Sequence, residues 1–236
     1  MTNMTDLDFT EEDNYFKTVQ SEMLPKIREF RASNSYRLTK KLLDVKKQDG
    51  RPTFDFIDLI QLSMSFIHFK EEPNIRCLLE KAKLLERLHL SVDIGQSLVG
   101  VLSASARTLK VLDLRVPLYH YRLPPLSGLC EELEAMAGHN ALETLSFEVL
   151  VDSHDTFDSI GYTIQQVENV LVKPGWSALR QVSFKLPVQH PRSHRGESSE
   201  LTEALQSLPD RYLSHLSKLE SVAFNYSAYP VYYYSN

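Results

Sequence analysis

The stretch Leu85-Glu-Arg-Leu88-His-Leu90-Ser-Val92 decides the fold, because its pattern returns along most of the chain. An apolar residue is followed by two others and then by strict alternation of apolar and polar residues. Alternation with a period of two predicts a β-strand with one buried face. The same phrase begins again at four clear positions and two looser ones: Leu109, Leu142, Leu179 and Leu219, then Leu59 and Ile27.

The spacing of these copies predicts how the strands are connected. Successive copies begin 24 to 40 residues apart, which is too far for hairpin partners. The gaps carry helical patterning, and strand–helix–strand connections of this length predict parallel pairing with right-handed crossovers. The expected helices are Tyr36–Lys47, Asn74–Lys83, Gln96–Arg107, Leu129–Ala137, Ile160–Val172 and Glu197–Leu208.

Two architectures are compatible with such connections. A doubly wound α/β domain buries both sheet faces, so its strands read as continuous apolar runs. Here the alternate positions are polar, as at Arg87, His89 and Ser91, which favours an α/β solenoid of six or seven irregular repeats. We expect one parallel sheet on its concave side, helices outside, and a buried spine made of Leu88, Leu90, Leu112, Leu114, Leu145, Phe147, Val182, Phe184, Val222 and Phe224.

The phrases LLERLHLSV, TLKVLDLRV, ALETLSFEV, WSALRQVSFKL and KLESVAFNY resemble the irregular leucine-rich repeats of fungal F-box-associated proteins. The resemblance covers roughly residues 27–226 and implies a ribonuclease-inhibitor-like horseshoe. Members of that group often begin with an F-box, the helical module that docks the Skp adaptor of a ubiquitin ligase. Leu24-Pro25-Lys26-Ile27 is similar to an F-box start, but the three helices that should follow are missing, so we expect no binding of the Skp adaptor.

The expected domain organisation has three parts. Residues 1–26 are an acidic tail with a capping helix near Glu11–Met23, which begins at Thr10-Glu-Glu-Asp13 and would cover the open end of the solenoid. Residues 27–228 form the leucine-rich-repeat domain. Residues 229–236 are a tyrosine-rich tail that we expect to be frayed, as chain ends commonly are.

Composition excludes several classes of partner. The net charge of −5 equals the five acids of the first thirteen residues, so the remaining body is balanced and predicts no nucleic-acid or anionic-membrane footprint. No apolar stretch approaches the roughly 20 residues that span a bilayer. Only two cysteines are present, and no secretory signal is recognisable, so we expect an intracellular protein, cytoplasmic or nuclear. We also expect a monomer.

Motifs for catalysis, phosphate loops and metals are missing from the sequence. It has no G-x-S-x-G elbow, no H-E-x-x-H pair, no glycine-rich phosphate loop and no papain-like cysteine phrase. Cys77 and Cys130 lie in apolar helical patterns, which is typical of core residues. His190 and His194 are separated by Pro191, which disfavours helical ligand geometry. We therefore expect no cofactor and no metal site.

Two surfaces are candidates for binding a protein partner. The first is a column on the concave sheet, with Arg115, Glu148 and Lys185 between Ser65 and Ser91 on one side and Asn225 on the other. The second is the edge formed by the loops after the strands, where aromatic and arginine residues are typical of interfaces. That edge carries Tyr119, Tyr121, Arg122, Phe157 and Arg192, and we expect it to contribute more than the column.

The leading functional hypothesis is a non-catalytic protein-interaction scaffold, related to the substrate receptors of the F-box group. Two alternatives stay open. One is a purely structural or vestigial solenoid without a partner, and the other is an enzyme whose site lies in the edge loops.

Overall fold

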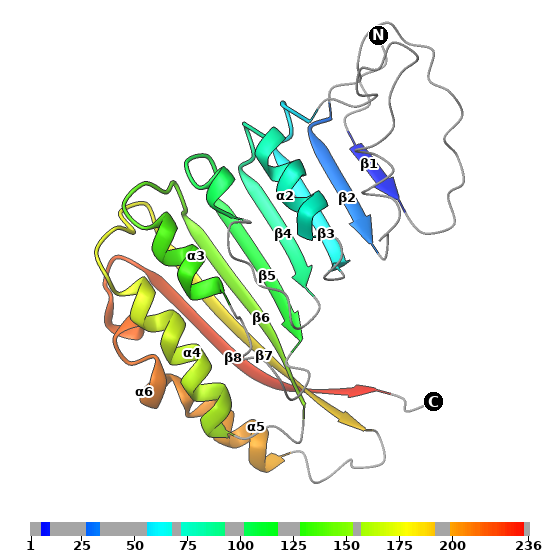
Figure 1. The fold of residues 1–236 in the computed structure, drawn as a ribbon. Helices are drawn as coiled ribbons and strands as arrows, with labels where there is room; N and C mark the ends of the chain where they lie inside the picture. The colour runs from blue at the N-terminus through cyan, green and yellow to red at the C-terminus, as the bar shows by residue number, and fades with distance from the viewer. Residues whose placement is uncertain are drawn as a thin grey trace, which may run out of the picture.

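In the described part of the chain, eight parallel strands in chain order form one sheet (Figure 1). The computed structural model describes residues 6–9, 27–33, 56–67, 72–92, 102–117, 128–152, 157–191 and 199–233. Each strand pairs in parallel with the next one along the chain. The strands are β1 (Asp6–Phe9), β2 (Glu29–Ser33), β3 (Gln61–Ile67), β4 (Arg87–Val92), β5 (Val111–Pro117), β6 (Thr144–Asp152), β7 (Gln181–Pro191) and β8 (Ala223–Tyr233).

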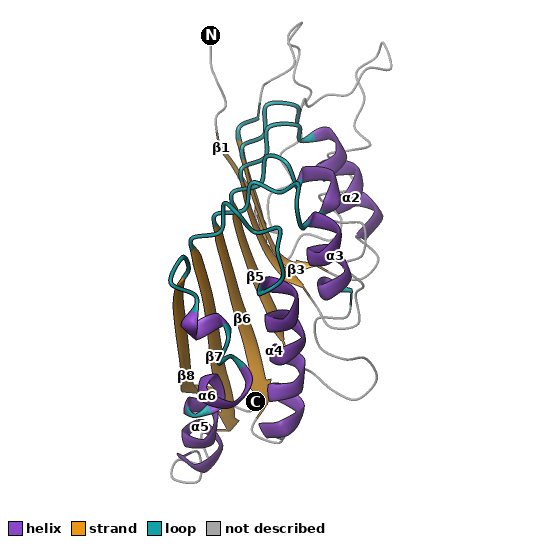
Figure 2. Ribbon diagram, turned by 90° about the vertical axis from the view of Figure 1, so that its left-hand side faces the viewer, coloured by secondary structure: helices purple, strands orange, loops and turns teal. Residues whose placement is uncertain are grey.

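The helices form a second layer that covers one face of the sheet (Figure 2). They are α2 (Glu72–Lys81), α3 (Leu129–Met136), α4 (Phe157–Leu171), α5 (Ser199–Gln206) and α6 (Leu208–Tyr212), with short 3-10 turns η2 (Ser103–Ser105) and η4 (Leu216–Lys218). The helices expected at 74–83, 129–137, 160–172 and 197–208 are confirmed within a few residues. Of the expected helix 96–107, the described part is the turn η2, and the helix expected at 36–47 lies outside the described residues.

The apolar spine between the two layers forms where the repeated phrase places it. The predicted spine residues of β4 to β7 are buried, from Leu88 to Phe184. Adjacent strands are in register at these positions, so Leu88 pairs with Leu112, and Leu112 with Leu145. The rings of Phe147 and Phe184 stack with their centroids 4.8 Å apart. Burying each such side chain stabilises the fold by about 1.5–3 kcal/mol before conformational entropy is counted.

The predicted register of the last strand is wrong by two residues. The repeated phrase aligns Val222 with Val182, but the structure pairs Phe224 with Val182 and Tyr226 with Phe184. A shift of two keeps each side chain on its expected face, because the strand period is two. Val222 and Phe224 are only partly buried, since β8 has a described neighbouring strand on one side only.

Both ends of the sheet extend further than the sequence analysis predicts. Residues 6–9, assigned there to an acidic tail, form β1 and pair with β2. The capping helix expected at Glu11–Met23 lies outside the described residues. Tyr229–Tyr233 were expected to fray, but they continue β8 because the long strand β7 offers Pro187–Pro191 as partners along their whole length.

Two buried glutamates fasten the helical layer to neighbouring turns. Glu132 of α3 accepts hydrogen bonds from the backbone N–H groups of Leu102, at 2.8 Å, and Ser103, at 3.0 Å. Glu168 of α4 accepts bonds from the N–H groups of His215, at 2.8 Å, and Leu216, at 2.9 Å. Both side chains are almost fully buried, so these donors compensate carboxylates that would otherwise be costly to remove from water.

A glycine pair joins the turn after α3 to the turn after α4. The N–H of Gly138 donates to the carbonyl of Gly175 at 2.9 Å, and both glycines have positive φ. A Cβ atom at Gly175 would lie 2.7 Å from the nitrogen of Gly138, so no side chain fits there. Asn140 Nδ2 also donates to the Gly175 carbonyl, at 3.0 Å. The close approach of these two turns therefore requires glycine.

Candidate functional site

The face of the sheet opposite the helices is polar, and no described helix crosses it (Figure 2). We call this surface the polar face. Its side chains alternate with the buried spine along each strand. From β2 to β8 it comprises Glu29 and Arg31; Gln61 and Ser63; Arg87, His89 and Ser91; Val111, Asp113 and Arg115; Thr144, Ser146 and Glu148; Gln181, Ser183 and Lys185; and Ala223, Asn225, Ser227 and Tyr229.

The structure brings the predicted charged column together on this face. Arg115 pairs in register with Glu148, and Glu148 with Lys185. Arg115 Nε lies 3.1 Å from Glu148 Oε1, so the two charges form an ion pair across β5 and β6. Both side chains are partly exposed, and Lys185 is exposed. The charges along this column therefore alternate in sign. Lys185, the cation on β7, remains open to solvent.

The two ends of this column differ from the prediction. The residue beside Lys185 on β8 is Ser227 and not Asn225, which pairs with Ser183. The register between β3 and β4 shifts after Met64, at the position of Ser65, so a neighbouring pair of Ser65 and Ser91 is not recorded. Ser91 does pair with Arg115 as expected.

Tyr229 belongs to this candidate site, whereas its place in the sequence predicts a frayed tail. It pairs with Pro187, and the residue is 38% exposed. Partial burial raises the pKa of its hydroxyl, with a further contribution from the charge of Glu148. The alternation that begins at Phe224 places Tyr229 on the same face as Lys185, so counting in steps of two along β8 would have found it.

A second group of polar residues lies over β2 to β5. His89 Nδ1 lies 2.9 Å from Asp113 Oδ2, and this contact holds the pKa of the Asp113 carboxyl below its usual value, with help from Lys185 and Ser146. The pair borders a depression of about 380 Å³ that is also lined by Arg31 and Arg87. This part of the polar face therefore combines two guanidinium groups with a fixed histidine.

Ser63, His89 and Asp113 occupy neighbouring positions on three adjacent strands. That order is the one needed for a nucleophile, a general base and an orienting carboxylate. Among the described contacts the Asp113–His89 bond is present, but Ser63 makes no hydrogen bond to His89. The nucleophile-to-base contact that would activate a serine is thus missing from this row.

The predicted edge residues are mostly outside the described part of the chain. Tyr119, Tyr121, Arg122 and Arg192 all fall there, and their role stays a prediction. Phe157 is described, and it lies in the first turn of α4 rather than in a loop. Its ring is half-buried against Tyr212, with the centroids 5.8 Å apart, and the Arg211 guanidinium lies 5.7 Å from its centroid. Phe157 therefore has a packing role inside the helical layer.

Other chemistry is sparse in the described residues. They contain no cluster of three or more histidine, cysteine, aspartate or glutamate side chains placed to hold a metal ion. Burial, together with Glu131 and Glu134, raises the pKa of the Cys130 thiol to about 11, which disfavours the reactive thiolate. None of the described helices combines the length and the apolar character needed to cross a membrane.

Comparison with known proteins gives no match: neither a family model, nor a curated protein, nor a solved structure resembles this chain significantly.

Proposed function

We propose that the protein is a solenoid of the leucine-rich-repeat type that acts as a non-catalytic scaffold for protein interaction, with the polar face as its binding surface. One observation carries the proposal: an eight-stranded sheet has one face that no described helix covers (Figure 2). Solenoids use such extended surfaces to bind other macromolecules. The chain-order pairing of the strands, with helices on the other face, supports the repeat architecture.

The chemistry of the polar face favours a protein partner over a small ligand. Its groups are spread over seven strands, and both signs of charge are present on adjacent strands. Tyrosine and arginine, the residue types enriched in interface hot spots, occur together at Tyr229 and Arg115. A balanced, extended surface of this kind suits a folded or extended polypeptide better than the clustered basic charge that a nucleic acid requires.

Within the polar face, the residues differ in how much binding energy they can supply. Arg115 and Glu148 already neutralise each other, so a partner that buries them must desolvate a satisfied pair. Tyr229 offers apolar area with a hydroxyl at low entropic cost, and Lys185 is an exposed cation beside the pair. We propose Tyr229 and Lys185 as the main contacts and the Arg115–Glu148 pair as the surface that orients the partner.

The non-catalytic role stays a prediction, and the Ser63–His89–Asp113 row, which holds a histidine–carboxylate bond, is the place where a catalytic alternative would be tested. The edge residues Tyr119, Tyr121, Arg122 and Arg192 stay a prediction as a second part of the same interface. Phe157 also stays a prediction, and the contacts of its ring with Tyr212 and Arg211 leave part of that ring open to a partner.

The proposal is tested by capturing partners from the native cell with the wild type and two matched variants. The first variant changes Tyr229, Lys185 and Arg115 to alanine on the polar face. The second breaks the ion pair of Lys173 and Glu134, 2.6 Å apart on the helical side, by alanine at both positions. A specific partner should be retained by the helical variant and lost by the face variant, at an expected cost of about 2 kcal/mol or more for Tyr229→Ala alone.

Equal capture by both variants would refute the polar face as the site. Loss only after alanine substitution of Tyr119, Tyr121, Arg122 and Arg192 would move the interface to the edge loops. Melting curves recorded for every variant separate a lost contact from a lost fold.

A further inference from the structure

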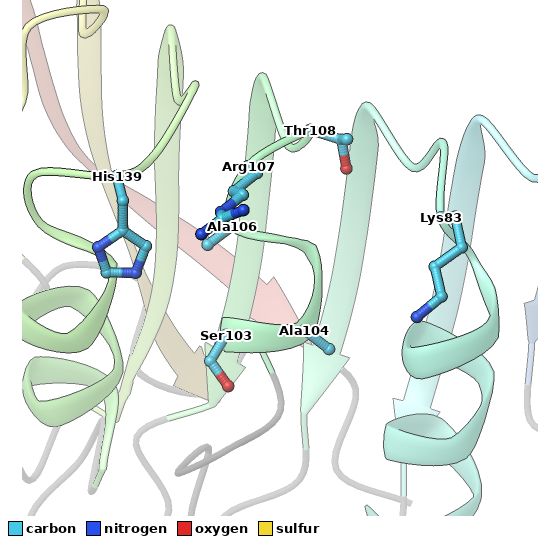
Figure 3. A pocket seen from close by; sticks show the side chains of 7 residues that line it. All are labelled: Lys83, Ser103, Ala104, Ala106, Arg107, Thr108 and His139. Carbon is cyan, nitrogen blue, oxygen red and sulfur yellow. The ribbon is translucent and has the colours of Figure 1, made fainter.

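A second hollow lies on the side of the sheet that carries the helices, at the amino ends of β4, β5 and β6 (Figure 3). Its volume is about 530 Å³. Three successive crossovers supply its walls: the turn after α2 supplies Lys83, the turn η2 and the residues after it supply Ser103 and Arg107, and the turn after α3 supplies His139. The hollow is separate from the polar face, which lies on the other side of the sheet.

The charge of this hollow has one sign. Lys83, Arg107 and His139 are all exposed, and no acidic side chain is among the lining residues. Within the described part of the chain, none of these three side chains forms an ion pair. The nearby acid on α3, Glu132, is buried and accepts two backbone N–H bonds from η2, so it is already compensated. The hollow therefore presents uncompensated basic groups to solvent.

The basic groups are spread along the crossovers and do not converge on one point. Lys83 and Arg107 each stand two residues before the phrase that begins the next strand, and His139 stands three residues before it. Figure 3 shows Arg107 between Lys83 and His139, and the small side chains of Ala104 and Ala106 also line the hollow. A single phosphate ion needs donors that surround it, whereas basic groups on three successive turns can each meet a different side chain of an extended peptide.

We propose that this hollow binds an extended acidic segment of a protein partner, with carboxylates placed against Lys83, Arg107 and His139. Charge complementarity identifies an acidic occupant, because the residues that line the hollow include basic side chains and the hydroxyl of Ser103 but no acidic side chain. This hollow is a second binding surface in addition to the polar face. The two proposals are independent, so either one can fail without affecting the other.

The experiment measures binding of a fluorescein-labelled peptide of alternating glutamate and alanine to the full chain by fluorescence anisotropy. A peptide with glutamine in place of glutamate is the neutral probe. Neutralising one cation, as in Arg107→Gln, should raise the Kd about two- to fivefold, the range expected for an exposed ion pair. The triple variant Lys83→Gln, Arg107→Gln, His139→Gln should raise it about tenfold or more, and Ala104→Glu should weaken binding by adding a like charge.

The matched control is Lys218→Gln, which removes one exposed cation from the equivalent turn before β8, outside the hollow. Its Kd should stay within about twofold of the wild type, which excludes a simple effect of net charge. Equal binding of the glutamine peptide, or unchanged binding by the triple variant, would overturn the proposal. So would displacement by sodium phosphate at matched ionic strength, since that result indicates a compact anion site. Melting curves confirm that each variant is folded.

Discussion

Strands β6 and β8 carry the same phrase, yet they end in different environments. In β6, Leu145 and Phe147 are completely buried between β5 and β7. At β8, the phrase is displaced by two residues, so Val222 lies just before the strand, and Val222, Phe224 and Tyr226 all remain partly exposed. The phrase therefore determines which face a side chain occupies, while neighbouring strands determine how deeply it is buried.

The largest effect should come from placing a charge in the interior strand. Leu145→Asp should abolish folding, because a lone buried carboxylate costs several kcal/mol against a domain stability of about 5–15 kcal/mol. Val222→Asp should cost only about 1–2 kcal/mol, since that side chain already reaches water. Circular dichroism melts of both variants measure the difference.

Thr144→Asp is the control for the comparison of Leu145→Asp with Val222→Asp. Thr144 is adjacent to Leu145 in the sequence, but its side chain lies on the polar face. It should change stability by less than about 0.5 kcal/mol. Similar losses in Thr144→Asp and Leu145→Asp would show that the two faces of β6 are not distinct, and the comparison with β8 would then fail.

The next largest loss of stability should come from the aromatic side chains that pack against one another from β6 through β7 to β8. Phe184 stacks on Phe147 and also contacts Phe224, with centroids 4.8 and 6.4 Å away. Phe184→Ala should cost about 3–5 kcal/mol, whereas Phe224→Ala should cost about 1–2 kcal/mol because its ring is less buried. Urea denaturation gives both values, and an equal cost would mean that the edge is packed as tightly as the interior.

A smaller effect is expected from the carboxylate that anchors the turn leading to β8. Glu168→Ala should lower stability by about 1–3 kcal/mol, because the N–H groups of His215 and Leu216 lose their acceptor. Amide hydrogen exchange should accelerate in β8 more than in β6. Glu168→Gln keeps one acceptor oxygen, so its loss should be smaller; uniform acceleration over the sheet would show that this carboxylate does not act locally.

The smallest effect should come from the hydrogen bond between His89 and Asp113 on the polar face. The folded pKa of Asp113 lies below its usual 3.8, so its contribution to stability is present above that pH and is lost as pH falls through the lowered value. Asp113→Asn should cost about 0.2–1 kcal/mol at neutral pH, as for other exposed pairs. The difference from wild type should vanish in acid melts, and a difference that persists unchanged below that range would exclude the carboxylate charge as its cause.

The comparison of β6 and β8 also shows which parts of the fold the sequence could predict. The alternation at Leu145 and Phe147 and the apolar patterns of α3 and α4 are local features of the sequence. They therefore predict the strand, the two helices and the side of each that is buried. The register of β8 is not local: it depends on where the chain emerges from η4, and two equally spaced alternations fit the same face. β1 was missed because Asp6 and Asp8 gave its short apolar pattern the composition of an acidic tail.

The sequence predicts those residues of the candidate site whose placement depends only on alternation along a strand. It does not predict those whose placement depends on the register between strands. Arg115, Glu148 and Lys185 occupy one column because three copies of the phrase align without a shift. Asn225 was placed beside Lys185 by the same rule and is wrong because β8 is displaced. The hollow around Arg107 could not be found from the sequence, since its walls come from three turns whose relative positions only the packing of α2, η2 and α3 determines.

The chain-order pairing of the strands has a mechanical consequence. Among the described strands, each is bonded only to its predecessor and its successor, and no pairing joins the first strands to the last. A pulling force applied at the two ends would therefore load every strand–strand contact with the same force. The strands should detach one after another, beginning with the weakest contact. The glycine contact between Gly138 and Gly175 ties two consecutive turns at backbone distance. This backbone hydrogen bond adds to the pairing of β6 with β7, so the units on its two sides should separate later than units joined by strand pairing alone.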